Sequence, residues 1–272
     1  MNEKKGATMK RIITLLLIIC CLLNLPIISV NALSSAYSWY CKRNSEHLQP
    51  QLPSEFSFIE KYDTIWINTK RNNNDEHKVA YLTFDAGYEN GNIAKILDVL
   101  KEKEAKGAFF ILENLINSNP ELVLRMQREG HLVCNHTAHH KDMSKIVNID
   151  TFAEELSALE SSYKQLTGCE ISHFYRPPEG RFSEENLKFA ESLGYSTVFW
   201  SFAYADWDNN KQPSEEYAIK KILDNLHNGA VLLLHPTSAT NATILGTIID
   251  EMRNNGYEIG TLEELKKELS QN

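Results

Sequence analysis

Residues Val79–Phe84 read VAYLTF, an apolar run that ends directly at Asp85. Val231–Leu234 reads VLLL and ends directly at His235. Continuous apolar runs of this kind predict β-strands that are covered on both faces. Similar runs alternate along the chain with helical segments, and this alternation predicts an α/β fold with a parallel sheet or barrel.

The remaining elements follow from the same patterns. Further strands are predicted at Ala108–Ile111, Leu132–Asn135, Ile171–Tyr175, Tyr195–Phe199, Ala230–Leu234 and Tyr257–Gly260. Helices are predicted at Asn92–Glu104, Pro120–Glu129, Asp150–Leu166, Ser183–Ser192, Ser214–Asn225, Ala242–Asn254 and Leu262–Leu269. Asp150 or Thr151 is expected to cap its helix, and Gly168 is expected to end it.

The N-terminal residues lie outside this pattern. A basic start precedes Ile12–Val30, which is almost wholly apolar. That arrangement predicts a secretory signal, with an uncleaved membrane anchor as the alternative. We therefore expect an exported protein with three parts: the signal peptide or anchor at 1–32, an N-terminal connecting segment at 33–72 that packs on the domain, and the main domain at 73–272.

Charge and cysteine content exclude several kinds of protein. The formal net charge is −8, so nucleic acid and anionic lipid are not electrostatically favoured partners. After the predicted signal the cysteines are Cys41, Cys134 and Cys169. Their odd number and irregular spacing indicate neither a disulfide framework nor a cysteine-type zinc site.

Ionisable and polar side chains follow the predicted strands, at the ends where parallel β/α folds build their active sites. The residues in these places are Asp85, His136, Thr137, His140, Arg176, Asp206, Trp207 and His235.

The stretches that contain these residues occur in a fixed order. They are Thr83–Gly87 (TFDAG), His136–His140 (HTAHH), Arg176–Gly180 (RPPEG), Asp206-Trp207 and Leu233–His235 (LLH). This ordered set resembles the five motifs of the polysaccharide deacetylase family, also called the NodB-homology domain or carbohydrate esterase family 4. The resemblance covers about residues 79–265. It implies a distorted (β/α) barrel and an enzyme that removes acetyl groups from polysaccharides.

Two longer stretches narrow the resemblance. Residues 83–91 (TFDAGYENG) and 198–201 (VFWS) are similar to the sporulation subgroup that deacetylates N-acetylmuramic acid. That subgroup makes the precursor of the muramic δ-lactam of spore cortex. The resemblance implies peptidoglycan glycan strands as the substrate and the cell wall or spore envelope as the location, with no protein partner. Glucosamine units, in peptidoglycan or a chitin-like polymer, remain an alternative substrate.

The family resemblance also implies roles for individual residues. Asp85 would be the general base in a metal-assisted attack of water, and Arg176 would keep Asp85 ionised and oriented. His235 would be the general acid that protonates the leaving amine. Asp206 would orient and charge His235.

His136 and His140 are the expected metal ligands. They lie four residues apart, so on a helical turn both imidazoles would face one side. Neutral imidazoles suit Zn²⁺, with Mn²⁺ or another divalent ion as an alternative. Taken alone, the pair would also fit an ordinary surface helix. His139 is expected to lie outside the ligand shell.

Two positions depart from the family pattern. Most members carry a second, metal-binding Asp where this chain has Ala86. Water or substrate would then complete the metal shell, or Glu89 would substitute, or the metal role would be lost. Glu179 replaces a more usual aromatic or basic residue, and a backbone N–H near it would help to hold the oxyanion. Glu179, Trp207 and Tyr88 are the candidate substrate-binding residues, although Trp207 and Tyr88 would equally suit the core.

Two other functions stay open on the sequence alone. Asp85 and Asp206 would serve as the carboxylate pair of a glycosidase, but that leaves the histidines without a role. Ala86 also permits a non-catalytic cell-wall binding module.

Overall fold

Strand β3 (Lys78–Ala86) is the central strand of the computed structural model, which describes residues 35–43, 46–72 and 74–271. It pairs in parallel with β4 (Gly107–Ile111), β9 (Ala230–Leu234) and β10 (Tyr257–Gly260). The signal or anchor predicted at 1–32 falls outside these residues. Among the helices of the described ranges, none is long and apolar enough to span a membrane.

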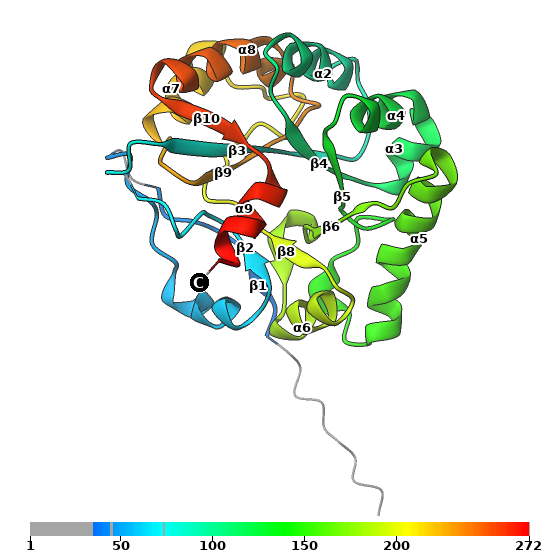
Figure 1. The fold of residues 1–272 in the computed structure, drawn as a ribbon. Helices are drawn as coiled ribbons and strands as arrows, with labels where there is room; N and C mark the ends of the chain where they lie inside the picture. The colour runs from blue at the N-terminus through cyan, green and yellow to red at the C-terminus, as the bar shows by residue number, and fades with distance from the viewer. Residues whose placement is uncertain (1–34, 44–45, 73, 272) are drawn as a thin grey trace, which may run out of the picture. The chain divides into compact units, whose positions relative to one another are not determined.

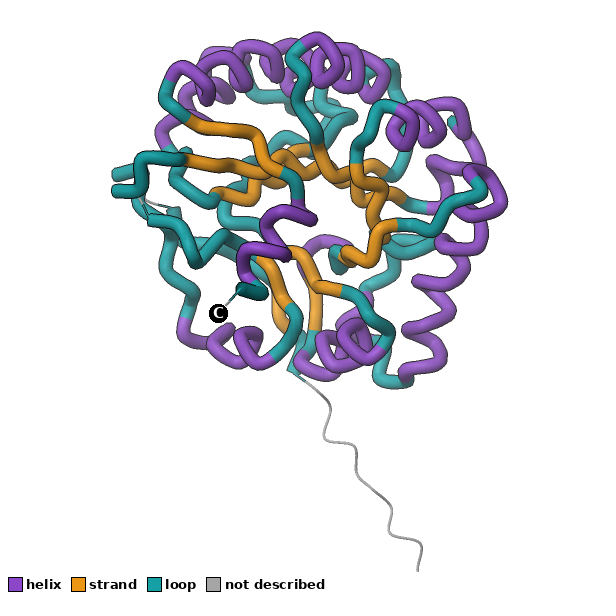
Figure 2. Tube along the Cα trace, in the orientation of Figure 1, coloured by secondary structure: helices purple, strands orange, loops and turns teal. Residues whose placement is uncertain are grey.

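The other main strands extend the sheet from β4. In order across the sheet they are β5 (Leu132–Asn135), β6 (Ser172–Tyr175), β8 (Ser196–Val198) and β2 (Thr64–Ile65). Every recorded pair in this sheet is parallel, and one bridge between Phe202 and Leu232 links the chain after β8 to β9. The strands curl around a common centre with helices outside them (Figure 2). The expected distorted (β/α) barrel is confirmed. A separate antiparallel pair joins β1 (Tyr37–Ser38) to β7 (Arg181–Phe182).

Each predicted helix is present, and no end shifts by more than three residues. The helices are α2 (Ile93–Glu102), α3 (Glu113–Ser118), α4 (Pro120–Arg128), α5 (Ile149–Thr167), α6 (Glu184–Ser192), α7 (Glu215–Asp224), α8 (Ala239–Asn254) and α9 (Leu262–Leu269). The 3₁₀ helices are η1 (Ser54–Lys61), η2 (Met143–Lys145) and η3 (Pro178–Gly180). Figure 1 labels the helices α2 to α9.

Helix caps explain why the predicted N-cap of α5 is wrong and why α8 begins three residues before its predicted start. Asn148, rather than Asp150 or Thr151, caps α5, because its side-chain oxygen accepts the N–H groups of both those residues. Gly168 ends the helix as expected, with φ 73°. Helix α8 begins three residues early because Ser238 caps it. The sequence patterns did not predict α3 or the 3₁₀ helices.

Alternation along β3 sets the position of the site. Ala80, Leu82, Phe84 and Ala86 belong to the large apolar cluster that includes residues of the surrounding helices, whereas Tyr81 belongs to the inner cluster. Successive strand side chains point to opposite faces, so Thr83 and Asp85 share the inner face with Tyr81. The inner cluster also contains Phe110, Val231 and Leu265, and it packs the barrel interior. Asp85 therefore stands at the strand end above a filled core.

The segment before β3 packs on the barrel through aromatic side chains. Trp39 stacks on Phe199 with ring centroids 4.4 Å apart, and Trp39 Nε1 donates a hydrogen bond to the carbonyl oxygen of Trp200 (2.9 Å). Phe56 and Phe182 belong to the same buried cluster. The segment therefore lies against the end of β8.

Candidate active site

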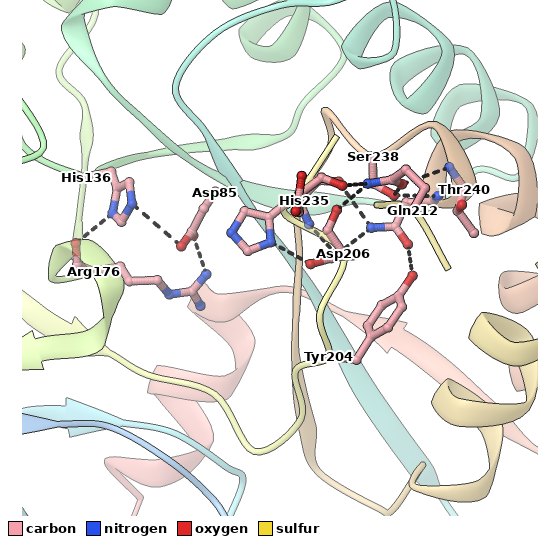
Figure 3. A network of polar contacts seen from close by, with 11 residues as sticks. Asp85, His136, Arg176, Tyr204, Asp206, Gln212, His235, Ser238 and Thr240 are labelled. Carbon is pink, nitrogen blue, oxygen red and sulfur yellow. Dashed lines mark hydrogen bonds and ion pairs between the residues drawn. The ribbon is translucent and has the colours of Figure 1, made fainter. Parts of the chain in front are cut away.

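An ion pair between Asp85 and Arg176 lies at the centre of the site (Figure 3). Arg176 Nη1 donates to Asp85 Oδ1 at 2.7 Å, and Nη2 donates to Thr83 Oγ1 at 2.8 Å. The guanidinium also donates to the carbonyl oxygens of Val198 (3.1 Å) and Phe199 (3.3 Å). Arg176 is fully buried, so its orientation is fixed by these four acceptors.

Burial and charge act in opposite directions on Asp85. Desolvation alone would raise its pKa, but the charge and hydrogen bond of Arg176, together with the nearby His136 and His235 rings, hold the pKa of Asp85 below its ordinary value. Asp85 is therefore an ionised carboxylate near neutral pH, which is the form that accepts a proton.

His136 is buried beside this pair. Its Nδ1 lies 2.8 Å from the carbonyl oxygen of Arg176, and its Nε2 lies 3.6 Å from Asp85 Oδ2. A carbonyl only accepts hydrogen bonds, so this contact assigns the proton to Nδ1 and leaves the Nε2 lone pair available. Burial lowers the pKa of His136 to about 4, so the ring is neutral. These are the tautomer and charge that a metal-binding imidazole needs.

The segment between His136 and His140 is not helical, which corrects the expected helical turn. Thr137 and His140 adopt left-handed conformations with φ 74° and 55°. Thr137 Oγ1 accepts the backbone N–H of His140 at 3.0 Å, and Thr137 N donates to Asn135 Oδ1 at 2.9 Å. The tight turn still brings the two imidazoles together, with ring centroids 5.2 Å apart.

His136 and His140 alone do not make a complete metal site. Two imidazoles suit a divalent ion, but no group of three His, Cys, Asp or Glu able to hold one occurs in the described ranges. Ala86 is buried in the outer apolar cluster and supplies no donor atom. Glu89 Oε2 accepts the N–H of Ile93 at the start of α2, its Oε1 is buried without a hydrogen-bond partner, and Glu89 is not among the residues that line the cavity beside the two histidines. Its substitution as a ligand stays a prediction. His139 is largely exposed and contacts Glu155.

His235 and Asp206 form the second polar pair. His235 Nδ1 lies 2.7 Å from Asp206 Oδ1, and the backbone N–H of His235 donates to Asp206 Oδ2 at 2.8 Å (Figure 3). Burial would lower the pKa of His235, but the hydrogen bond and charge of Asp206 outweigh it and raise this pKa above its ordinary value. His235 is therefore readily protonated, as a general acid requires.

Asp206 is itself tightly held and sealed from solvent. Asn241 Nδ2 donates to Asp206 Oδ2 at 2.6 Å, and the Tyr204 hydroxyl bonds to Asn241 Oδ1. Asp206 is fully buried and engaged by three donors, so it does not suit the exposed carboxylate role of a glycosidase. Asn241 and Tyr204 were not found by sequence reasoning, because neither sits at a strand end or in a recognisable motif.

One cavity of about 770 Å³ unites the two pairs. Its wall includes Asp85, His136, His140 and His235. Glu179, Tyr88 and Trp207 also line it, and the last two are 47% and 63% exposed, so they are rim residues rather than core. The backbone of Glu179 is left-handed, with φ 56°. Its carboxylate oxygen Oε2 lies 3.8 Å from Arg181 Nη1. Arg43, from the N-terminal segment, lines the cavity as well and was missed, because that segment shows no catalytic pattern.

Comparison with known proteins agrees with this geometry. Residues 72–198 match the family described as Polysaccharide deacetylase. The chain is 38% identical, over 84% of its length and 85% of the relative, to the Bacillus subtilis protein named peptidoglycan-N-acetylmuramic acid deacetylase PdaA. It is 32% identical, over 77% of its length and 74% of the relative, to a Bacillus cereus peptidoglycan-N-acetylglucosamine deacetylase.

Solved structures give the same result. The structure of Bacillus subtilis PdaA, a family 4 carbohydrate esterase, superposes with a TM-score of 0.81 at 37% identity, covering 87% of this chain and 99% of that one. A family 4 carbohydrate esterase from Bacillus anthracis superposes with a TM-score of 0.69 at 34% identity, covering 86% and 97%. With the ordered motifs, the curled parallel sheet and one member of each polar pair on the wall of one cavity, these matches place the chain in the polysaccharide deacetylase family, among the carbohydrate de-N-acetylases.

Proposed function

We propose that this protein hydrolyses the N-acetyl group of N-acetylmuramic acid residues in peptidoglycan glycan strands. One observation carries the proposal: the same cavity holds a carboxylate whose pKa is lowered and an imidazole whose pKa is raised. Two titratable groups with pKa values pushed apart are the expected arrangement of a general base and a general acid. The named substrate of the Bacillus subtilis relative favours the muramic unit.

In the proposed reaction Asp85 takes a proton from the attacking water, and the new oxygen–carbon bond forms at the acetamide carbonyl. Arg176 keeps Asp85 ionised and fixes the direction of its free oxygen, because the guanidinium holds Oδ1 at 2.7 Å. His235 then donates a proton to the amide nitrogen as the carbon–nitrogen bond breaks, giving acetate and a free amine. The protonated His235 imidazole is stabilised because its Nδ1–H donates to the Asp206 carboxylate.

A divalent ion, if bound, would be held by His136 and His140. It would polarise the carbonyl and make water more acidic at neutral pH. With Ala86 in place of a carboxylate, we propose that water or a substrate oxygen completes the shell and that the ion binds weakly. Zn²⁺ is the first candidate and Mn²⁺ the second.

The product chemistry links this activity to the spore wall. Deacetylation leaves an amine on C2 of the muramic ring, next to the lactyl group on C3. Loss of water between that amine and the lactyl carboxylate closes a six-membered lactam. Because the motifs resemble those of the sporulation subgroup, we propose that the protein acts outside the cytoplasm during cortex formation, where it makes the precursor of muramic δ-lactam.

The test is acetate release by purified residues 33–272 from isolated glycan strands. The protein is assayed untreated, after chelation, and with Zn²⁺ or Mn²⁺ restored, and mass analysis locates the lost acetyl group. We expect the muramic residues to lose acetyl groups. Asp85→Asn should abolish acetate release, and added metal should restore the activity of the chelated protein.

Each other function has its own outcome in the same assay. Acetate lost from glucosamine residues alone would make the protein a glucosamine deacetylase, as the Bacillus cereus relative is named. If the protein still binds glycan strands but releases no acetate with any added metal, it would be a wall-binding module.

A further inference from the structure

Arg43 stands on the wall of the catalytic cavity, although it comes from the N-terminal segment outside the family motifs. It lines the same cavity as Asp85 and His235. Among the cavity-lining residues that the structure describes, it is the one lysine or arginine. A permanent cation on this wall can meet an anionic group of a substrate that is bound in the cavity.

Neighbouring contacts hold this part of the segment against the barrel. Cys41 Sγ donates to the carbonyl oxygen of Ser201 at 2.9 Å, and Trp39 makes its bond to Trp200 two residues earlier. The Arg43 guanidinium carbon lies 5.8 Å from the centre of the Phe202 ring. The Arg43 side chain is exposed, and the backbone before it is held against the barrel by these contacts. A bound ligand would therefore have to order this side chain but not the whole segment.

The cavity charges leave Arg43 available. Asp85 is compensated by Arg176 at 2.7 Å, and Glu179 lies 3.8 Å from Arg181. Within the described ranges no ion pair to a carboxylate is recorded for Arg43. An anionic group of a substrate that enters this cavity would therefore find Arg43 as the wall cation that no carboxylate in the described ranges is recorded to pair.

We propose that Arg43 binds the lactyl carboxylate of the muramic unit and so determines specificity for muramic over glucosamine residues. This inference rests on the proposed function. The two sugars differ by the lactyl ether at C3, next to the acetamide at C2, so the carboxylate lies beside the reacting group. A guanidinium matches a carboxylate with two parallel N–H bonds, a geometry that lysine lacks.

The experiment measures binding separately from catalysis, in the Asp85→Asn background. Dissociation constants are determined by calorimetry for two muramic glycans, one with free lactyl carboxylates and one with methyl-esterified carboxylates. The charge preference is the ratio of the second constant to the first. We expect a preference of roughly tenfold or more, because hydrogen bonds to charged groups are among the stronger ones.

Arg43→Ala should reduce this preference toward one, and Arg43→Lys should retain part of it. Lys42→Ala is the matched control, since Lys42 is exposed, adjacent and absent from the cavity wall, and it should keep the full preference. Raising the ionic strength should weaken the Arg43-dependent part. Circular dichroism verifies that each variant is folded.

The outcomes separate the two proposals. A preference that Arg43→Ala leaves unchanged, while the starting enzyme releases acetate from muramic residues, overturns the role of Arg43 and keeps the function. An Arg43-dependent preference without any acetate release overturns the function and keeps Arg43 as a carboxylate-binding residue.

Discussion

Replacing Asp206 by Asn tests the acid half of the site. The two Asp206 oxygens accept three hydrogen bonds, from His235 Nδ1, His235 N and Asn241 Nδ2. An amide has one oxygen, so in either orientation its NH₂ group must face at least one donor. If the amide oxygen faces the two donors at the Oδ2 position, its NH₂ meets His235 Nδ1 and favours the tautomer that lacks the Nδ1 proton.

The magnitude follows from these contacts. A hydrogen bond to a charged group contributes about 1.5–3 kcal/mol, and that stabilisation of the imidazolium is lost. His235 then protonates less readily, and its proton donation to the amine weakens. Since about 1.4 kcal/mol is tenfold in rate, we expect kcat/KM to fall about 10- to 150-fold, which lies toward the lower part of the contribution of about 10²–10⁴ that general acid–base catalysis makes.

The pH dependence has a definite sign. The folded-state pKa of His235 is raised, so activity that needs the protonated ring is present at low pH and is lost as pH rises through this pKa. The stability contributed by the pair is likewise full below the unfolded-state pKa, roughly 6.5, and is lost as pH rises through the folded-state value. Asp206→Asn should move the alkaline limb of the activity profile to lower pH.

The assay is acetate release from glycan strands against pH, at substrate concentrations below KM, with NMR titration of the His235 ring. Asp208→Asn is the control, because it makes the same chemical change on the same loop at a residue outside the cavity wall. An alkaline limb that stays in place in Asp206→Asn would refute the reasoning.

Three further changes probe the rest of the site and its support. Arg176→Lys removes most of the four bonds of a buried guanidinium, so kcat/KM should fall about a hundredfold and urea denaturation should show a loss of about 3 kcal/mol; equal effects from Arg181→Lys, at a half-buried arginine, would contradict this. Thr83→Val removes the hydroxyl between Arg176 and Leu232, which should cost about 1–3 kcal/mol in the same assay, and an unchanged midpoint would argue against it. Trp39→Ala should cost about 3–5 kcal/mol because its buried indole stacks on Phe199; a loss below 1 kcal/mol would show that the segment is not part of the core.

Strand positions and the gathering of polar residues were predictable, because both depend on short-range patterns. An apolar run that ends in a charged residue places that residue at the strand end, and parallel strands bring such ends together. This is how Asp85, His136 and His235 come to line one cavity, with Arg176 buried behind Asp85. The roles assigned to them stay predictions until the variants are measured.

Features that depend on backbone turns or on distant contacts were not predictable. The His136–His140 spacing suggested a helix, but two left-handed residues and the Thr137 hydroxyl make a tight turn instead. Asn241 reaches Asp206 because Ser238 starts α8 early, and no local pattern reports that contact. Arg43 joins the site through the packing of a segment that looked like a connector.

The central position of β3 also bears on how the protein opens. The strand pairs with β4, β9 and β10, so its amides should be among the slowest to exchange with solvent, opening close to global unfolding. Tyr88 and Trp207, in contrast, lie exposed on loops that can fray locally. On warming, the loops that carry Tyr88 and Trp207, the proposed substrate-binding residues, should therefore open first, while β3 still holds Asp85, the proposed base. Hydrogen exchange followed by mass spectrometry would resolve this order.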